Sequence, residues 1–243
     1  MERKAQSKKL DYKKEFPDLY LPKKKPVLIE VPKMTFIMVK GKGNPNTSAA
    51  YADALSLLYG LSFGIKMNLK FDKVPGDIRK GMCMEEGSPV SEGNYTVPPL
   101  EGLWWTEDKQ TAFDGRKLVN KDELRWFSMI RQPDEVTEEL FAWAKAELGK
   151  KKPELDTSAA KLLTYEEGLC AQLLHVGPYD DEPASIEVLE RFIEEQGFEG
   201  DFRMEEGDVQ KGRYHHEIYL GDPRRTAPER LKTVIRHPVS KKK

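Results

Sequence analysis

Hydrophobic and polar residues alternate along the chain with two periods, and these periods predict an ordered series of strands and helices. Short apolar runs bounded by Gly, Pro or charged residues predict strands at 27–31, 34–39, 100–106, 123–130, 169–176, 213–220 and 231–236. Apolar positions three and four residues apart predict helices over about 48–66, 136–148 and 183–196. Met-rich strand signals also occur at 78–85. This mixture of helices and short strands predicts an α+β fold.

The same order of elements occurs twice. A strand, a glycine turn and a helix follow one another near 34–66 and again near 169–197, about 135 residues later. The segments 129–133 (MIRQP) and 234–238 (VIRHP) also match in residue type. We therefore predict two βαββ modules that are related by a pseudo-two-fold axis, each with one helix on one face of an antiparallel sheet.

This repeat predicts the domain organisation. Module one spans about 30–133 and module two about 160–239, with an inserted helix at about 136–150. A basic N-terminal arm at 1–26 precedes them, because residues 1–25 carry nine Lys or Arg and four Asp or Glu. We expect most of this arm to be solvated, although a basic arm could also touch nucleic acid.

The overall composition limits the classes of partner. The 243 residues include 40 basic and 41 acidic side chains, and this balance argues against a dedicated nucleic-acid binder. No apolar run approaches the length of a membrane span. Two cysteines, Cys83 and Cys170, form neither a disulfide framework nor a CxxC motif, and we expect both to be inert. These features predict a cytoplasmic protein without nucleic-acid or membrane partners.

Glu217 is the sharpest candidate for chemistry. Strand alternation places it on one face with His215 and Tyr219. A carboxylate beside a Tyr can stabilise a cation, or act as a general acid or base if burial raises its pKa. The alternative from pattern alone is an exposed ion pair. Glu101 holds a similar place in the strand of the first repeat, either as an equivalent site residue or in a structural role.

Aromatic side chains are candidates for stacking on a flat ligand. Trp104 and Trp105 are adjacent on a strand, so they point to opposite faces and at most one shares the side of Glu101. Each aromatic residue has an ordinary core position as its alternative. The further candidates are Tyr51, Tyr59, Tyr95, Trp126, Tyr179 and Tyr219.

Other chemistry lacks a supporting motif. The four histidines do not have metal-ligand spacing, and we expect His175 and His237 to be structural. There is no GxSxG elbow, and Gly41 and Gly43 lack the rest of a phosphate loop. We therefore predict neither a metal nor a cofactor.

Four segments together resemble the GyrI-like family of bacterial small-molecule-binding domains. They are PNTSAAYADAL, LEGLWW, HVGPYDDEP and HHEIYLGDPRRTAPERLKTVIRHPV, and the likeness spans about residues 10–239. The resemblance implies a small-molecule-binding domain at 27–239 with a deep aromatic cleft for flat, often cationic xenobiotics. It also implies that Glu217 points into that cleft, and that Arg224 and Arg225 fix the following loop.

The resemblance is closest to stand-alone members that lack a DNA-binding module, some of which look like hydrolases of cyclopropane-bearing DNA alkylators. In that case Glu217 would activate water, and a Tyr hydroxyl would donate to the substrate carbonyl. Two alternatives remain open: a non-catalytic sequestering or effector-binding protein, and a protein-interaction inhibitor of a DNA enzyme. Whether the chain is an enzyme therefore also stays open. The expected partner is a small xenobiotic, and the expected state is a monomer or weak dimer.

Overall fold

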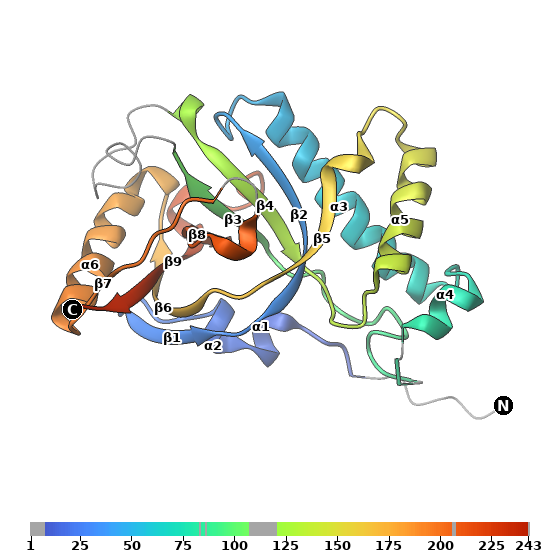
Figure 1. Ribbon diagram of the computed structural model, residues 1–243, viewed down its shortest axis with the longest axis horizontal. Helices are drawn as coiled ribbons and strands as arrows, with labels where there is room; N and C mark the ends of the chain where they lie inside the picture. Colours follow the sequence, from blue (N-terminus) through green and yellow to red (C-terminus); the bar gives the residue numbers. More distant parts are fainter. Residues whose placement is uncertain (1–7, 83, 86, 107–120, 206–207, 243) are drawn as a thin grey trace.

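One large antiparallel sheet organises the chain. The computed structural model describes residues 8–82, 84–85, 87–106, 121–205 and 208–242. Its strands follow the order β1-β6-β9-β8-β3-β4-β2-β5, and β7 pairs with β9 (Figure 1). Their bounds are β1 Val27–Val31, β2 Met34–Lys42, β3 Leu100–Trp105, β4 Arg125–Arg131, β5 Ala160–Tyr165, β6 Gly168–Val176, β7 Phe198–Gly200, β8 His215–Tyr219 and β9 Lys232–Lys241.

The strand order is symmetric about the pairing of β3 with β8. On one side stand β3, β4 and β2, and on the other β8, β9 and β6. With α3 (Ala49–Lys70) and α6 (Glu182–Glu195), the chain runs β2-α3-β3-β4 and then β6-α6-β8-β9. The α+β class with two βαββ arrangements is therefore confirmed. The outermost strands are exchanged, because β1 pairs with β6 and β5 pairs with β2.

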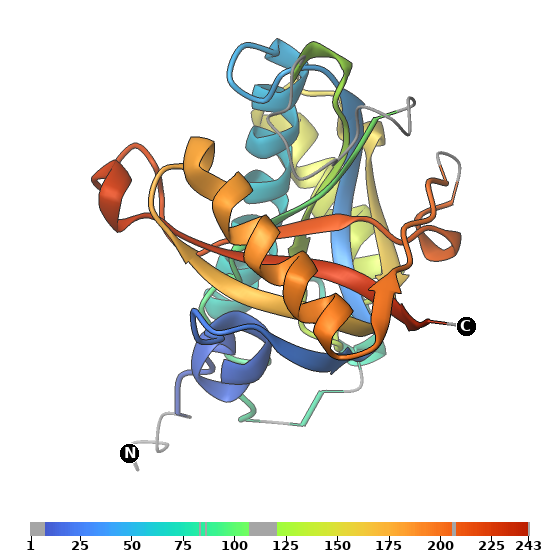
Figure 2. The same cartoon turned by 90° about the vertical axis from the view of Figure 1, so that its left-hand side faces the viewer.

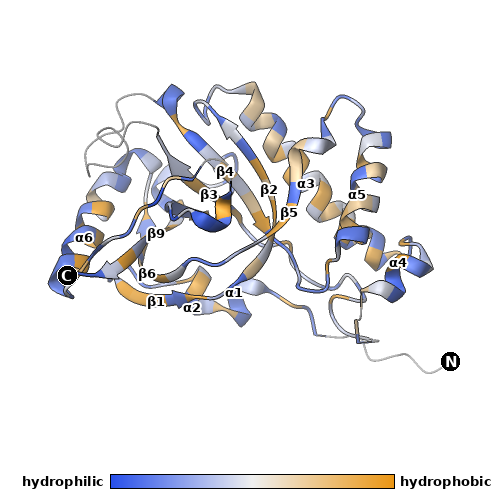
Figure 3. Ribbon diagram, in the orientation of Figure 1, coloured by the Kyte–Doolittle hydropathy of each residue, from blue (hydrophilic) through white to orange (hydrophobic). Residues whose placement is uncertain are grey.

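Helices α3 and α6 cover the same face of the sheet, toward opposite ends (Figures 1 and 2). Leu58 and Leu61 of α3 pack with Ile37 of β2, and Leu189 of α6 packs with Ile235 of β9. In Figure 3, α6 alternates between hydrophobic and hydrophilic residues, as expected of a helix with one buried side. Helix α5 (Glu138–Lys151) lies beside α3. We call the side of the sheet that carries α3 and α6 the helix face.

Capping side chains fix where the helices begin. The Ser48 hydroxyl accepts a hydrogen bond from the backbone N–H of Tyr51 at the start of α3. The Thr137 hydroxyl does the same for Leu140 at the start of α5. Each cap satisfies a backbone donor that the helix itself leaves without a partner.

The opposite face of the sheet, here the back face, is covered by the N-terminal segment. Two short helices, α1 (Tyr12–Glu15) and α2 (Pro17–Tyr20), bury Tyr12, Leu19 and Tyr20 against an apolar cluster that includes Phe36 and Trp105. The expectation of a solvated arm is therefore wrong for this segment, because its apolar side chains complete the core. Residues 1–7 of the predicted arm lie outside the described residues.

The strand expected at 78–85 is also corrected, because the chain forms a helix there, α4 (Gly76–Gly81). Pro75 precedes its first turn, and Arg79 within it donates to the backbone carbonyl of Ser91 at 2.6 Å. Cys83 lies outside the described residues, whereas Cys170 is a buried free cysteine. Among the described helices, none is both long and apolar enough to cross a membrane.

Candidate ligand cleft

A cleft of about 1830 Å³ opens on the helix face, with walls from α3 and α6 and a floor from β3 and β8. Tyr51 and Tyr59 line it from α3, and Ile186 lines it from α6. Trp104 and Glu217 contribute to the floor from neighbouring strands. Its volume exceeds the roughly 300–1000 Å³ of common small-molecule pockets, so a sizeable polycyclic ligand can fit.

Glu217 is held in the floor by two hydrogen bonds. One carboxylate oxygen, Oε1, lies 2.9 Å from His215 Nε2, and Oε2 accepts from the Tyr219 hydroxyl at 2.6 Å. The Trp104 indole N–H in turn donates to the Tyr219 oxygen at 3.0 Å. Burial opposes ionisation of Glu217, but the hydrogen bonds from His215 and Tyr219 lower its pKa. The carboxylate is therefore ionised and fixed in orientation.

Glu182 places a second carboxyl group beside Glu217. It is the first residue of α6, it is 6% exposed, and it lines the same cleft as Glu217. Burial and the negative charge of Glu217 raise the pKa of Glu182 well above its usual value. Its Oε1 has no hydrogen-bond partner within the part of the chain that the structure describes. The cleft thus pairs a carboxyl group whose pKa is raised with one whose pKa is lowered.

Aromatic rings surround this carboxyl pair. The Tyr51 and Trp104 ring centroids are 5.9 Å apart, and those of Tyr179 and Tyr219 are 5.7 Å apart at a near-perpendicular angle. Burial raises the pKa of Tyr179 to about 12, so its hydroxyl stays protonated at neutral pH. Tyr59 is 37% exposed and stands nearer to solvent. This arrangement suits a flat ligand with a cationic or electron-poor centre.

Three of the predicted aromatic contacts do not line the cleft. Trp105 points to the back face and packs on Phe127 with a centroid distance of 5.0 Å. Tyr95 is 1% exposed within the core beneath α3. Trp126 is also a core residue, and its ring meets that of Tyr51 edge-on at 5.0 Å, so it supports the cleft wall from behind. Burial in the core is the physical reason for all three corrections.

Glu101 does not occupy a site equivalent to that of Glu217. In the β3–β8 register it pairs with Ile218, whereas Glu217 pairs with Gly102, so the two carboxylates lie on opposite faces of the sheet. Glu101 Oε2 lies 3.0 Å from His216 Nε2, and its Oε1 accepts from the Tyr20 hydroxyl. Glu101 and Glu217 therefore lie on equivalent strands of the two repeats but point to opposite faces of the sheet.

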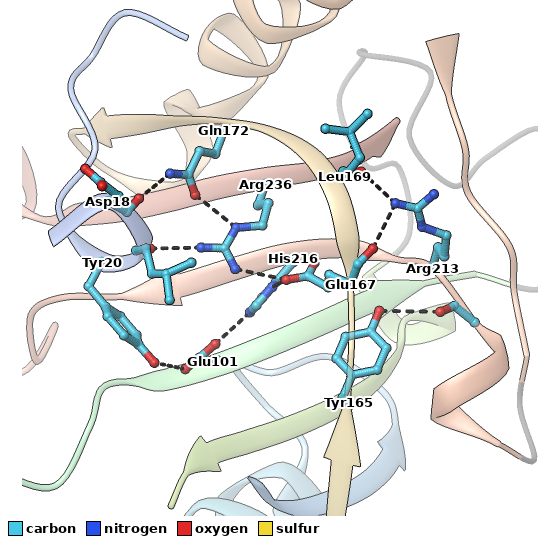
Figure 4. Close-up of polar contacts among 12 residues, drawn as sticks. Asp18, Tyr20, Glu101, Tyr165, Glu167, Leu169, Gln172, Arg213, His216 and Arg236 are labelled. Carbon is cyan, nitrogen blue, oxygen red and sulfur yellow. Dashed lines mark hydrogen bonds and ion pairs between the residues drawn. The ribbon is translucent and has the colours of Figure 1, made fainter. Parts of the chain in front are cut away.

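A buried polar network on the back face fixes the N-terminal segment (Figure 4). Glu167 accepts from Arg236 Nη1 and lies beside His216 Nδ1, both at 2.9 Å. Burial opposes ionisation of Glu167, but these two partners lower its pKa to about 2. Arg236 also donates to the backbone carbonyl of Leu19 at 2.8 Å, and Gln172 donates to that of Asp18. These bonds tie α2 to the sheet that carries the cleft.

The sequence does not single out Glu182 as a functional residue. It stands in the HVGPYDDEP segment, but nothing local shows that the start of α6 brings it against a strand 35 positions further along. The prediction that His215, Glu217 and Tyr219 share one face is confirmed. The Arg224 guanidinium binds Asp222 through two hydrogen bonds of 3.0 Å at the rim of the cleft.

This architecture matches a known protein family and several solved structures. A model of the GyrI-like small molecule binding domain matches residues 134–240. A solved structure described as an uncharacterized conserved protein from Listeria innocua is 41% identical, with 96% of this chain and 100% of that chain covered and a TM-score of 0.77. This chain belongs to the GyrI-like family.

Two further GyrI-like relatives of known structure are described as hydrolases from Listeria innocua. They are 39% and 42% identical to this chain, with TM-scores of 0.74 and 0.77. In both cases the alignment covers 96% of this chain and 100% of the other. A search of proteins with curated functions finds no match. The chain is thus a GyrI-like small-molecule-binding domain with the fold of proteins described as hydrolases.

Proposed function

We propose that this protein binds flat hydrophobic or cationic xenobiotics in the aromatic cleft, and that it hydrolyses cyclopropane-bearing DNA alkylators. The observation that carries the proposal is the pair of neighbouring carboxyl groups of Glu182 and Glu217 in a cleft lined by aromatic rings, with the pKa of Glu182 raised and that of Glu217 lowered. Two carboxyls with separated pKa values are a common arrangement for acid and base chemistry. The hydrolase descriptions of two close relatives also support it.

Ligand recognition would depend on the aromatic rings of the cleft and on the negative charge of Glu217. Trp104, Tyr51 and Tyr179 present π-faces and edges to a flat substrate, with each contact contributing about 0.5–2 kcal/mol. The negative charge of Glu217 would attract a ligand with a cationic or electron-poor centre. The aromatic contacts and the attraction by Glu217 are both strengthened because the cleft floor is shielded from water.

In the hydrolytic step, Glu217 takes a proton from a water molecule, and the water oxygen forms a bond to one cyclopropane carbon. The strained carbon–carbon bond breaks, and its electron pair moves through the conjugated ring to the carbonyl oxygen. That oxygen takes the proton of Glu182 and becomes a phenol hydroxyl. A proton transfer between the two neighbouring carboxyl groups then returns the proton from Glu217 to Glu182. Tyr219 orients the base, since its hydroxyl donates to Glu217 rather than to the substrate.

The test uses catalytic amounts of the full chain with a cyclopropane-fused dienone alkylator, and follows the water adduct by mass spectrometry. Many turnovers are expected for the wild type, and Glu217→Gln should lower the rate by about 10²–10⁴-fold because an amide cannot accept the proton. Glu194→Gln, an exposed change on α6, is the matched control and should keep full activity.

Two outcomes contradict this proposal in different ways. If the alkylator perturbs Trp fluorescence and raises the melting temperature without turnover, the protein is a sequestering binder. If Glu217→Gln keeps the wild-type rate with unchanged affinity, the assigned base is wrong. A folded Glu217→Gln variant is verified by its thermal melt, so loss of activity is separated from loss of structure.

A further inference from the structure

A continuous line of side chains runs along the helix face of the sheet, from Glu217 to the surface of α6. His215 Nε2 lies 2.9 Å from Glu217 Oε1, and His215 Nδ1 lies 2.7 Å from His237 Nε2. The other nitrogen of His237, Nδ1, lies 2.5 Å from Glu190 Oε1. Both imidazoles are buried, whereas the Glu190 side chain is 40% exposed. The line therefore joins the cleft floor to solvent.

Counting protons along this line fixes its charge. Each ionised carboxylate can only accept, so His215 must carry a proton on Nε2 and His237 must carry one on Nδ1. The bond between the two rings needs one further proton, on either His215 Nδ1 or His237 Nε2. Three protons on four ring nitrogens make one imidazole neutral and the other cationic. The complete line with both carboxylates ionised thus holds one extra proton.

We propose that His215 and His237 share one proton between Glu217 and Glu190, and that this pair relays protons between the cleft and the solvent-exposed edge of α6. The transfer is a shift of three protons in one direction. Glu190, protonated from solvent, gives its proton to Nδ1 of a neutral His237, His237 Nε2 gives its proton to His215 Nδ1, and His215 Nε2 gives its proton to Glu217. The reverse shift returns the proton to solvent. No electrons or further reactants are required.

The surroundings of His215 oppose a cation on the inner ring of the pair. Burial lowers the pKa of His215, although the neighbouring Glu217 charge opposes this, and the positive charges of His237 and His216 lower it further. Glu182 adds a carboxyl group with a raised pKa on the cleft side, and the Glu190 carboxyl group faces His237 from α6. The uncharged Phe202 ring packs edge-on against His237 at 5.0 Å and shields it.

A metal-binding role does not fit this cluster. The two imidazole nitrogens are 2.7 Å apart, which is a hydrogen-bond distance and too short to hold an ion between them. Over the described ranges of the chain, no group of three or more His, Cys, Asp and Glu side chains is arranged to hold a metal ion. The contact between the rings is therefore a proton-sharing one.

Nitrogen NMR on protein with isotopically labelled histidine tests the shared proton without any substrate. At neutral pH the wild type should show three protonated nitrogens on His215 and His237 together. In Glu190→Gln the protein fraction that carries the third proton should fall by about tenfold or more, because the opposing charge is lost. Glu194→Gln, on the same helix, should leave the spectrum unchanged. A wild type with two neutral imidazoles, or a Glu190→Gln spectrum identical to that of the wild type, would overturn the proposal.

A second measurement links the relay to turnover, and this part rests on the proposed function. A protonated histidine pair favours the ionised form of Glu217, so Glu190→Gln, which removes the carboxylate that faces the pair, should move the acid limb of the rate–pH profile to higher pH. Absence of turnover in the wild type together with three protonated nitrogens would refute the hydrolase and keep the relay. An unshifted acid limb in an active Glu190→Gln variant would refute the relay while the hydrolase stands.

Discussion

Glu182→Gln should stabilise the protein increasingly as the pH rises. The pKa of Glu182 is raised in the folded state. Folding therefore takes up a proton at any pH between the pKa of 4.5 in the unfolded chain and the higher pKa in the folded protein. This group therefore adds its full stability below pH 4.5, and that stability is lost as the pH rises toward the folded pKa. Gln has the same shape and no titration, so the variant lacks this loss.

The magnitude follows from linkage. One proton taken up on folding changes the free energy of unfolding by about 1.4 kcal/mol per pH unit, so the advantage of Glu182→Gln should grow by that amount from about pH 5 to 6. For a chain of this size, that corresponds to about 3–6 °C in melting temperature.

Urea unfolding followed by tryptophan fluorescence, repeated at about pH 5, 6 and 7, gives the required free energies. The exposed Glu194→Gln change controls for a general effect of removing a carboxylate, and its offset from the wild type should stay constant. An offset for Glu182→Gln that is equally constant across these pH values would show that Glu182 is ionised in the folded protein. The acid–base pair in the cleft would then be refuted.

Two more substitutions test the cleft and its support. Trp104→Phe keeps an aromatic ring but removes the N–H that donates to Tyr219. Ligand affinity, measured by isothermal titration calorimetry, should weaken by up to about tenfold. An unchanged dissociation constant would show that this hydrogen bond does not shape the site. Arg236→Met removes one of the two partners that stabilise the buried charge of Glu167, and urea unfolding should show a loss of about 3–5 kcal/mol. A loss below about 1 kcal/mol would show that the network contributes little to stability.

Local periodicity was enough to predict much of this fold. The apolar run at 34–39 and the three- and four-residue spacing that follows it are properties of neighbouring residues, and they correspond to β2 and α3. The same holds for β6, α6 and β8 in the second half. Strand alternation also placed Glu217 and Tyr219 on one face, because the side-chain period of a strand is independent of its partners.

Features that depend on distant partners could not be predicted in this way. Whether the helix-face core or the cleft takes an aromatic side chain is decided by packing, and so Tyr95 and Trp126 were assigned to the wrong environment. The Glu182–Glu217 pair joins the start of α6 to β8, and the histidine pair joins β8 to β9. Residue type at each position gave no sign of these contacts, since each histidine alone also suits an ordinary buried site.

The exchange of the outermost strands means that the two halves of the molecule are interlocked. The strand β1 precedes the first βαββ unit along the chain but completes the sheet of the second, and β5 precedes the second unit but completes the sheet of the first. A fragment limited to residues 134–240 would leave the outer edge of β6 open and β5 without β2. Such an open edge is a template for pairing with another copy. The repeat in the sequence is therefore not a pair of autonomous domains, and the cleft between its halves exists only when both fold as one cooperative unit.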